Sequence, residues 1–242
     1  MEQSLRPAIK PMLKAAAIFI FLSFAVRALQ SAAALGDAFT AAATHALTKI
    51  LLILVVMLVA WRSGVSLPRM GFQRGNGKPW TWLGATAVLA GAVTSITIIG
   101  LGLPPNPIVG QLGLAGFLVH VVLLSSIAEE LLCRGLLQAE LETAFAGSAG
   151  YLGISFPVWF SGAMFGWLHL TLLPVVAIET VAVILAFTTI LGTLCAVARE
   201  RTRSLGPPIA IHMLGNIGGL LGGILMVISA QVLQGPAGRQ LA

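Results

Sequence analysis

Long apolar runs alternate with short polar segments along almost the whole chain. Each run approaches the ~20 residues that a helix needs to cross a bilayer. Spans are predicted at residues 12–31, 43–61, 81–103, 112–138, 151–170, 174–198 and 207–232. Each must be helical, because backbone groups in lipid have to be satisfied within their own segment. The pattern therefore predicts an all-α fold, a polytopic transmembrane helical bundle of about seven spans, with six to eight compatible.

The composition also indicates a protein that lies in lipid. Of the 242 residues, 57% are hydrophobic and only 9% are charged, whereas soluble domains carry about 25% charged residues. The net charge of +6 comes from basic clusters at 6–14, 62–78 and 199–203. These clusters form no basic helix face, which argues against nucleic acid. They indicate cytoplasmic segments under the positive-inside rule. We expect a multi-pass integral membrane protein with a cytoplasmic N-terminus and anionic lipid head groups around its basic residues.

One apolar run ends in charged residues. Charges within spans cost about 2.5–3.5 kcal/mol each on insertion scales and mark candidates for function. Glu129 and Glu130 close the run that begins at Leu112, and Arg134 follows. Glu130 and Arg134 are i,i+4 neighbours that are expected to pair, while Glu129 is rotated away by about 100°. The spacing predicts one neutralised and one available carboxylate. The structural alternative is a buried ion network, but a single cation would leave an excess negative charge.

Two further pairs of residues lie in later runs. Phe165 and His169 are one helical turn apart, and His212 and Asn216 repeat the i,i+4 spacing in the last run. An imidazole and an amide on one helix face can donate two hydrogen bonds to one point, as in an oxyanion hole. Polar residues that merely join helices have the same pattern. Together, three spans contribute side chains suited to one hydrolytic site.

These residues fall into three ordered motifs. Glu-Glu-Leu-Leu-Cys-Arg at 129–134 resembles an EExxxR signature, Phe-Gly-Trp-Leu-His at 165–169 resembles FxxxH, and His-Met-Leu-Gly-Asn at 212–216 resembles HxxxN. In this order they resemble the CPBP family, also called Abi, which includes type II CAAX prenyl endopeptidases and bacteriocin-processing proteases. The resemblance covers about the second half of the chain and divides it into N-terminal helices with a basic cytoplasmic loop, 1–111, and a catalytic core, 112–242.

The resemblance implies an intramembrane endopeptidase of glutamic type that acts on a membrane-associated protein or peptide. By position, Glu129 would be the general base that activates water, helped by His169, and Phe165 would line the substrate cavity. The other implied site residues are two supporting groups and two oxyanion donors: Glu130, Arg134, His212 and Asn216.

Other functions use the same residues. Two histidines and two carboxylates can bind zinc around an open position, but there is no HExxH, and Asn216 would be an unusual ligand. Metal-free hydrolysis is therefore the favoured version. A non-catalytic membrane scaffold or immunity protein is the main alternative. A small transporter would use His120 and Glu179, but His120 is placed on the opposite helical face from Glu129, and Glu179 is placed near the membrane interface.

The predicted spans raise a geometric difficulty. In a full span at 151–170, His169 lies near the outer surface, whereas His212 lies near the inner end of its own span. Straight helices would keep the two apart. Either helices break near Gly150, Gly153, Pro157 and Pro174, or the topology is wrong by one crossing. The two cysteines, Cys133 and Cys195, are expected to be buried and unpaired.

Overall fold

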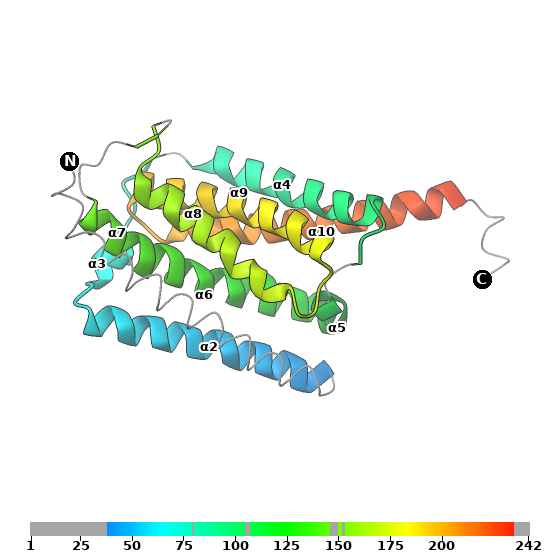
Figure 1. Ribbon diagram of the computed structural model, residues 1–242, viewed down its shortest axis with the longest axis horizontal. Coiled ribbons are helices and arrows are strands. Elements are labelled where there is room, and N and C mark those ends of the chain that lie inside the picture. The colour runs from blue at the N-terminus through cyan, green and yellow to red at the C-terminus, as the bar shows by residue number, and fades with distance from the viewer. Residues whose placement is uncertain (1–37, 79, 105–106, 146–149, 152, 235–242) are drawn as a thin grey trace.

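A computed structural model describes residues 38–78, 80–104, 107–145, 150–151 and 153–234, so the predicted span at 12–31 lies outside the described residues. The described chain is a helical bundle, as predicted, and the only β-bridge in this part joins Tyr151 to Ile154 (Figure 1). The helical elements in chain order are α2 Ala38–Arg62, α3 Leu67–Met70, α4 Thr81–Gly100, α5 Pro107–Gly116, η1 Phe117–Ser125, α6 Ser126–Glu130, η2 Leu131–Gln138, α7 Ala139–Ala144, α8 Phe156–Leu168, η3 His169–Leu172, α9 Ile178–Thr202 and α10 Gly206–Gln234.

Five helical segments of the described chain are long and apolar enough to cross a membrane. They match five of the predicted runs and are Ala42–Arg62, Thr81–Gly100, Leu112–Ala144, Ile178–Thr202 and Gly206–Val232. Large apolar side chains such as Leu54, Leu89 and Ile224 lie exposed on their outer faces. Burying this surface in lipid is favourable because lipid, unlike water, solvates apolar side chains.

The predicted span at 151–170 is shorter than expected. The Tyr151–Ile154 bridge and the positive φ of Gly153 form a turn there, and α8 begins only at Phe156, with a proline in its first turn. After 13 residues α8 tightens into the 3₁₀ turn η3 at His169. The α8 helix is therefore shorter than the ~20 residues of a straight membrane-spanning helix.

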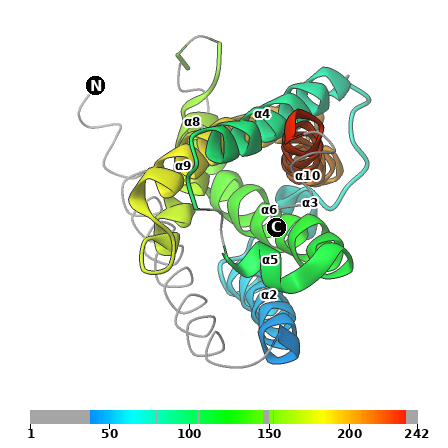
Figure 2. The same ribbon diagram turned by 90° about the vertical axis from the view of Figure 1, so that its right-hand side faces the viewer.

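The long helix from α5 to α7 occupies the middle of the bundle. Viewed end-on, it lies between α2 on one side and α4, α9 and α10 on the other (Figure 2). Its η1 and η2 stretches are π-helical and flank the five residues of α6. π-Helical turns are rare, and they occur frequently at functional sites.

The basic segments 62–78 and 199–203 gather at one end of the bundle, on the left in Figure 1, while the segment 6–14 lies outside the described residues. The Leu205 amide donates to the Gly71 carbonyl and the Asn76 amide to the Thr202 carbonyl. The Arg203 side chain reaches Glu142 on α7. These loops therefore lie at the same end of the bundle, as a shared side of the membrane requires. That this side is cytoplasmic stays a prediction.

Small residues allow the closest helix packing. A Cβ at Gly91 of α4 would clash with the Gly215 carbonyl of α10, and a Cβ at Gly218 would clash with the Val88 carbonyl. Gly162 and Gly166 of α8 lie in the same way against Thr193 and Thr189 of α9. Close approach of backbones through small residues is typical of membrane helix pairs, because lipid provides no hydrophobic drive between helices.

Replacing Gly218 by leucine should therefore separate α4 from α10. We expect Gly218→Leu to lower the free energy of unfolding by about 3 kcal/mol, because the obstacle is backbone and cannot move aside. Gly223→Leu is the matched control on the same helix, since a Cβ there meets nothing within 4 Å. Thermal unfolding of both purified variants measures the difference, and equal melting temperatures would contradict this account of the α4–α10 contact.

Candidate active site

The acidic pair of the EExxxR motif lies in α6, at the centre of the bundle. Glu129 is 7% exposed and Glu130 is fully buried. The two carboxylates point to different partners, as the helical phase predicts.

Glu130 forms the predicted ion pair. Arg134 Nη1 donates to Glu130 Oε1 at 3.0 Å, and neither side chain is exposed. Arg134 also donates from Nη2 to the Gly192 carbonyl of α9, and its guanidinium lies 4.8 Å from the centroid of the Phe165 ring. This arginine therefore joins the central helix to both α8 and α9.

Glu129 is not left available, and this part of the sequence prediction is wrong. Lys49 Nζ of α2 donates to Glu129 Oε1 at 2.6 Å, in a pair whose side chains are 7% and 9% exposed. The two carboxylates are thus matched by two cations, one from α2 and one from the next turn of the central helix itself. The argument that excess negative charge speaks against a structural ion network therefore no longer holds.

His212 lies between the two acids. Its Nδ1 is 2.9 Å from Glu130 Oε1, and its Nε2 is 3.9 Å from Glu129 Oε2. The ionised carboxylate of Glu130 can only accept, so Nδ1 carries the proton in this contact. The Nε2 nitrogen faces Glu129 at a distance longer than a hydrogen bond. Glu130 therefore orients the imidazole as well as pairing with Arg134.

His169 reaches the same cluster from the end of α8. Its Nδ1 lies 3.0 Å from the Phe165 carbonyl, which can only accept, so Nε2 is again the nitrogen left for chemistry. The Phe165 ring is fully buried and contacts both imidazoles, at centroid distances of 5.3 Å to His169 and 5.1 Å to His212. His169 interacts electrostatically with Glu129.

The short α8 explains how His169 and His212 can lie at a similar depth in the bundle. Because the helix begins at Phe156 rather than at residue 151 and ends at His169, this histidine stays within the bundle instead of at its far surface. The first of the two sequence alternatives, a helix interrupted near Gly153 and Pro157, is the correct one.

Asn216 lies one turn beyond His212 on α10, as predicted. Its Nδ2 donates at 3.3 Å to the Val121 carbonyl of η1 and at 3.3 Å to Ser126 Oγ of α6. In this state the amide joins α10 to the central helix. To hold an oxyanion, it would have to exchange one of these two bonds.

His120 faces α2, as Glu129 does, contrary to the expectation that the two lie on opposite helical faces. Its ring stacks edge-on against His45 of α2 at a centroid distance of 5.8 Å, and His45 interacts electrostatically with Lys49 and Glu129. The expectation assumed a regular α-helix between residues 120 and 129. The π-helical turns of η1 change that phase, because their hydrogen bonds span five residues rather than four. Glu179 is exposed in the first turn of α9, as expected.

The described residues do not arrange a metal site. Among them, no group of three or more His, Cys, Asp or Glu side chains is placed to hold a metal ion. Lys49 contacts Oε1 of Glu129, and Glu130 contacts Nδ1 of His212.

The motifs, their order and their convergence on one buried cluster can be compared with known proteins. Residues 111–218 match the family model described as type II CAAX prenyl endopeptidase, Rce1-like. The chain carries an Rce1-like domain. No curated protein and no solved structure matches the chain. The matched residues hold all three motifs, and the activity class that the family description names is proteolysis.

Lys49 lies outside the Rce1-like domain, and the sequence reasoning missed it. The signal was nonetheless present, because a lysine inside the apolar run 43–61 marks a candidate for function by the same rule that singled out the glutamates. What the chain alone did not indicate is which carboxylate it meets, 80 residues away.

Removing Lys49 should leave Glu129 as an uncompensated buried charge. We expect Lys49→Met to lower the free energy of unfolding by about 3–5 kcal/mol, the usual cost of breaking a buried pair. Adding Glu129→Gln to this variant should recover most of the loss. Lys78→Met, at an exposed loop position, is the control and should change stability by less than about 0.5 kcal/mol. Thermal unfolding in detergent measures all four proteins, and a wild-type melting temperature for Lys49→Met would disprove the pairing.

Proposed function

We propose that the protein is an intramembrane endopeptidase of glutamic type, in which Glu129 activates water. The observation that carries this proposal is the arrangement of two imidazoles around Glu129. Both have Nδ1 engaged, by Glu130 and by the Phe165 carbonyl, so Nε2 is the nitrogen left in each. Nε2 of His212 lies 3.9 Å from Glu129, and His169 interacts electrostatically with the same carboxylate. A carboxylate beside oriented imidazoles is a general-base arrangement.

The proposed reaction begins at Glu129. The carboxylate accepts a proton from water while the water oxygen attacks the carbonyl carbon of the scissile peptide bond. The negative charge that develops on the carbonyl oxygen is stabilised by donors from α10. When the C–N bond breaks, the proton returns from Glu129 or an imidazole to the leaving amine. The products are a new carboxylate and a new amine.

Two side chains have roles that depend on a change of partner. Asn216 donates to Val121 and Ser126, and it becomes an oxyanion donor by giving up one of these bonds. His212 joins it as a donor only when Nε2 carries a proton in addition to the one on Nδ1. Lys49 compensates the charge of Glu129 before water binds, and it must share that carboxylate with the incoming proton. Both changes are local. The hydrogen bonds of Asn216 are long, at 3.3 Å, and the Lys49 side chain can rotate about its own single bonds.

The substrate proposed is a membrane-associated protein or peptide. The Rce1-like family description names CAAX prenyl endopeptidases, which favours a substrate whose cleavage site lies close to a lipid anchor. The site itself, buried among lipid-exposed helices, favours an extended segment that enters from the bilayer.

A non-catalytic membrane scaffold is the second candidate. The observation that favours it is the charge balance of the cluster, since Lys49 and Arg134 neutralise both acids as in a purely structural network. The two candidates differ in whether a conservative change at Glu129 removes the biological effect of the chain. A scaffold should retain its effect in a Glu129→Gln variant that still folds.

Proteolysis predicts a sharp loss of activity at the proposed base. We expect Glu129→Gln and His169→Ala each to lower the rate of cleavage of a membrane-associated peptide by at least about 100-fold, the lower range for loss of general-base catalysis. Glu179→Gln, which changes an exposed carboxylate on α9, should leave the rate unchanged. Purified protein and an end-point assay by mass spectrometry are sufficient. Full activity in either site variant would remove the role proposed for that residue.

Metal dependence is tested separately. We propose metal-free hydrolysis, so wild-type cleavage should continue at an unchanged rate after dialysis against a strong chelator. The zinc version, which uses the same histidines and carboxylates, predicts loss of activity and its return on adding zinc. Melting temperatures recorded before and after dialysis show whether the chelator acts on the fold instead.

A further inference from the structure

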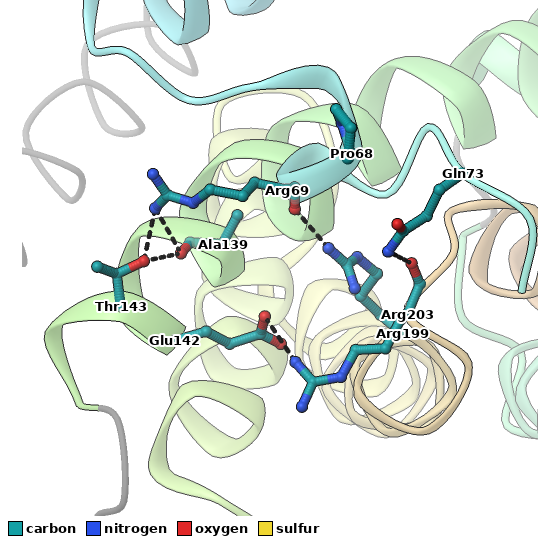
Figure 3. Close-up of a pocket in the computed structure, with 8 residues that line it drawn as sticks. All are labelled: Pro68, Arg69, Gln73, Ala139, Glu142, Thr143, Arg199 and Arg203. Carbon is teal, nitrogen blue, oxygen red and sulfur yellow. Dashed lines mark hydrogen bonds and ion pairs between the residues drawn. The ribbon is translucent and has the colours of Figure 1, made fainter. Parts of the chain in front are cut away.

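A polar pocket lies at the loop end of the bundle, away from Glu129 and Glu130. It has a volume of about 360 Å³ and is formed by α3, α7 and the C-terminal end of α9 (Figure 3). Arg69, Arg199 and Arg203 line it, together with a single carboxylate, Glu142. The lining therefore carries an excess of positive charge.

Arg199, the deepest of these arginines, uses only some of its hydrogen-bond donors. Arg199 is only 2% exposed, and its Nη2 donates to the Arg69 carbonyl at 2.5 Å. Its Nε and Nη1 are buried and have no hydrogen-bond partner among the described residues. A buried donor without an acceptor is costly.

The other two arginines are held at the sides of the pocket. Arg69 donates from Nη2 to Thr143 Oγ1 at 2.5 Å. Arg203 is 59% exposed and lies 3.5 Å from Glu142. Glu142 also accepts from Gln138 at 3.1 Å. The pocket lining thus has three guanidinium groups and one carboxylate, and Arg199 has unused donors for an anion.

The place of the pocket fits a phosphate group. Its lining residues come from the ends of the candidate spans Leu112–Ala144 and Ile178–Thr202 and from the basic loops beside them, and span ends are expected at the level of lipid head groups. Basic pockets between helices at this level bind anionic head groups, and guanidinium groups match phosphate with paired hydrogen bonds. Glu142 follows Glu129 by thirteen residues along the same helix, up to about 20 Å. The pocket is therefore separate from the catalytic cluster.

We propose that this pocket binds a phosphate group, supplied either by the head group of an anionic phospholipid or by free phosphate. Arg199 and Arg203 contact its oxygens, and Glu142 competes with it for Arg203. Binding at this point joins α3, α7 and α9 and so stabilises the loop end of the bundle. The proposal is independent of the proteolytic activity.

The test measures ligand-dependent thermal stability of the full chain in detergent. Three probes are titrated: short-chain phosphatidylglycerol, phosphatidylcholine with the same acyl chains, and inorganic phosphate. We expect phosphatidylglycerol or phosphate to raise the melting temperature at concentrations where phosphatidylcholine has no effect. Arg203→Gln should weaken binding about fivefold. Glu142→Gln should strengthen it, because the competing carboxylate is lost.

Arg74→Gln is the matched control. It removes the same charge from an exposed position of the neighbouring loop, outside the pocket lining, and it should leave binding unchanged. A response to phosphatidylglycerol alone identifies a lipid head group, and a response to inorganic phosphate identifies the free ion. No response to either probe, or equal weakening by Arg74→Gln and Arg203→Gln, would overturn the proposal. The opposite effects of Arg203→Gln and Glu142→Gln cannot arise from a general loss of folding.

Discussion

Charge balance in a medium that solvates ions poorly is the constraint on which this bundle depends. Glu129 and Glu130 are adjacent in the chain and buried together, where two unpaired carboxylates would cost several kcal/mol each. Arg134 compensates Glu130 from the next turn, and Lys49 compensates Glu129 from α2. The second pair also fixes where α2 lies, because its lysine has to reach the central helix.

The same polar side chains join the rest of the bundle. Arg134 donates to the Gly192 carbonyl and lies against the Phe165 ring, so it connects three helices at one depth. Glycines allow those helices to approach, as where Gly162 and Gly166 lie against α9. In lipid such packing and hydrogen bonds replace the hydrophobic drive that water would supply. The geometry of the site and the stability of the bundle therefore rest on the same contacts.

Two clusters of charge lie at different depths and differ in their balance. In the central cluster, the two carboxylates are paired with two cations. This balance suits a site where protons are exchanged but the net charge must stay low. The pocket at the loop end has three arginines and one glutamate, and it lies where water and head groups can supply an anion. The first arrangement is suited to chemistry within the bilayer, the second to holding the protein at its surface.

The sequence by itself determined that the protein lies in lipid, that it is helical and where most of its spans lie. Lipid requires long apolar runs whose backbone groups form hydrogen bonds within the same segment. The sequence also determined the Glu130–Arg134 pair, since both residues lie on adjacent turns of one helix. Only the tertiary structure decided that Lys49 meets Glu129, because this contact joins residues 80 positions apart and no local spacing encodes it. It likewise decided that His120 faces α2 as Glu129 does, because π-helical turns changed the phase that a regular helix predicts. Local periodicity reports which face a residue occupies, whereas the choice of partner across the bundle depends on how the helices pack.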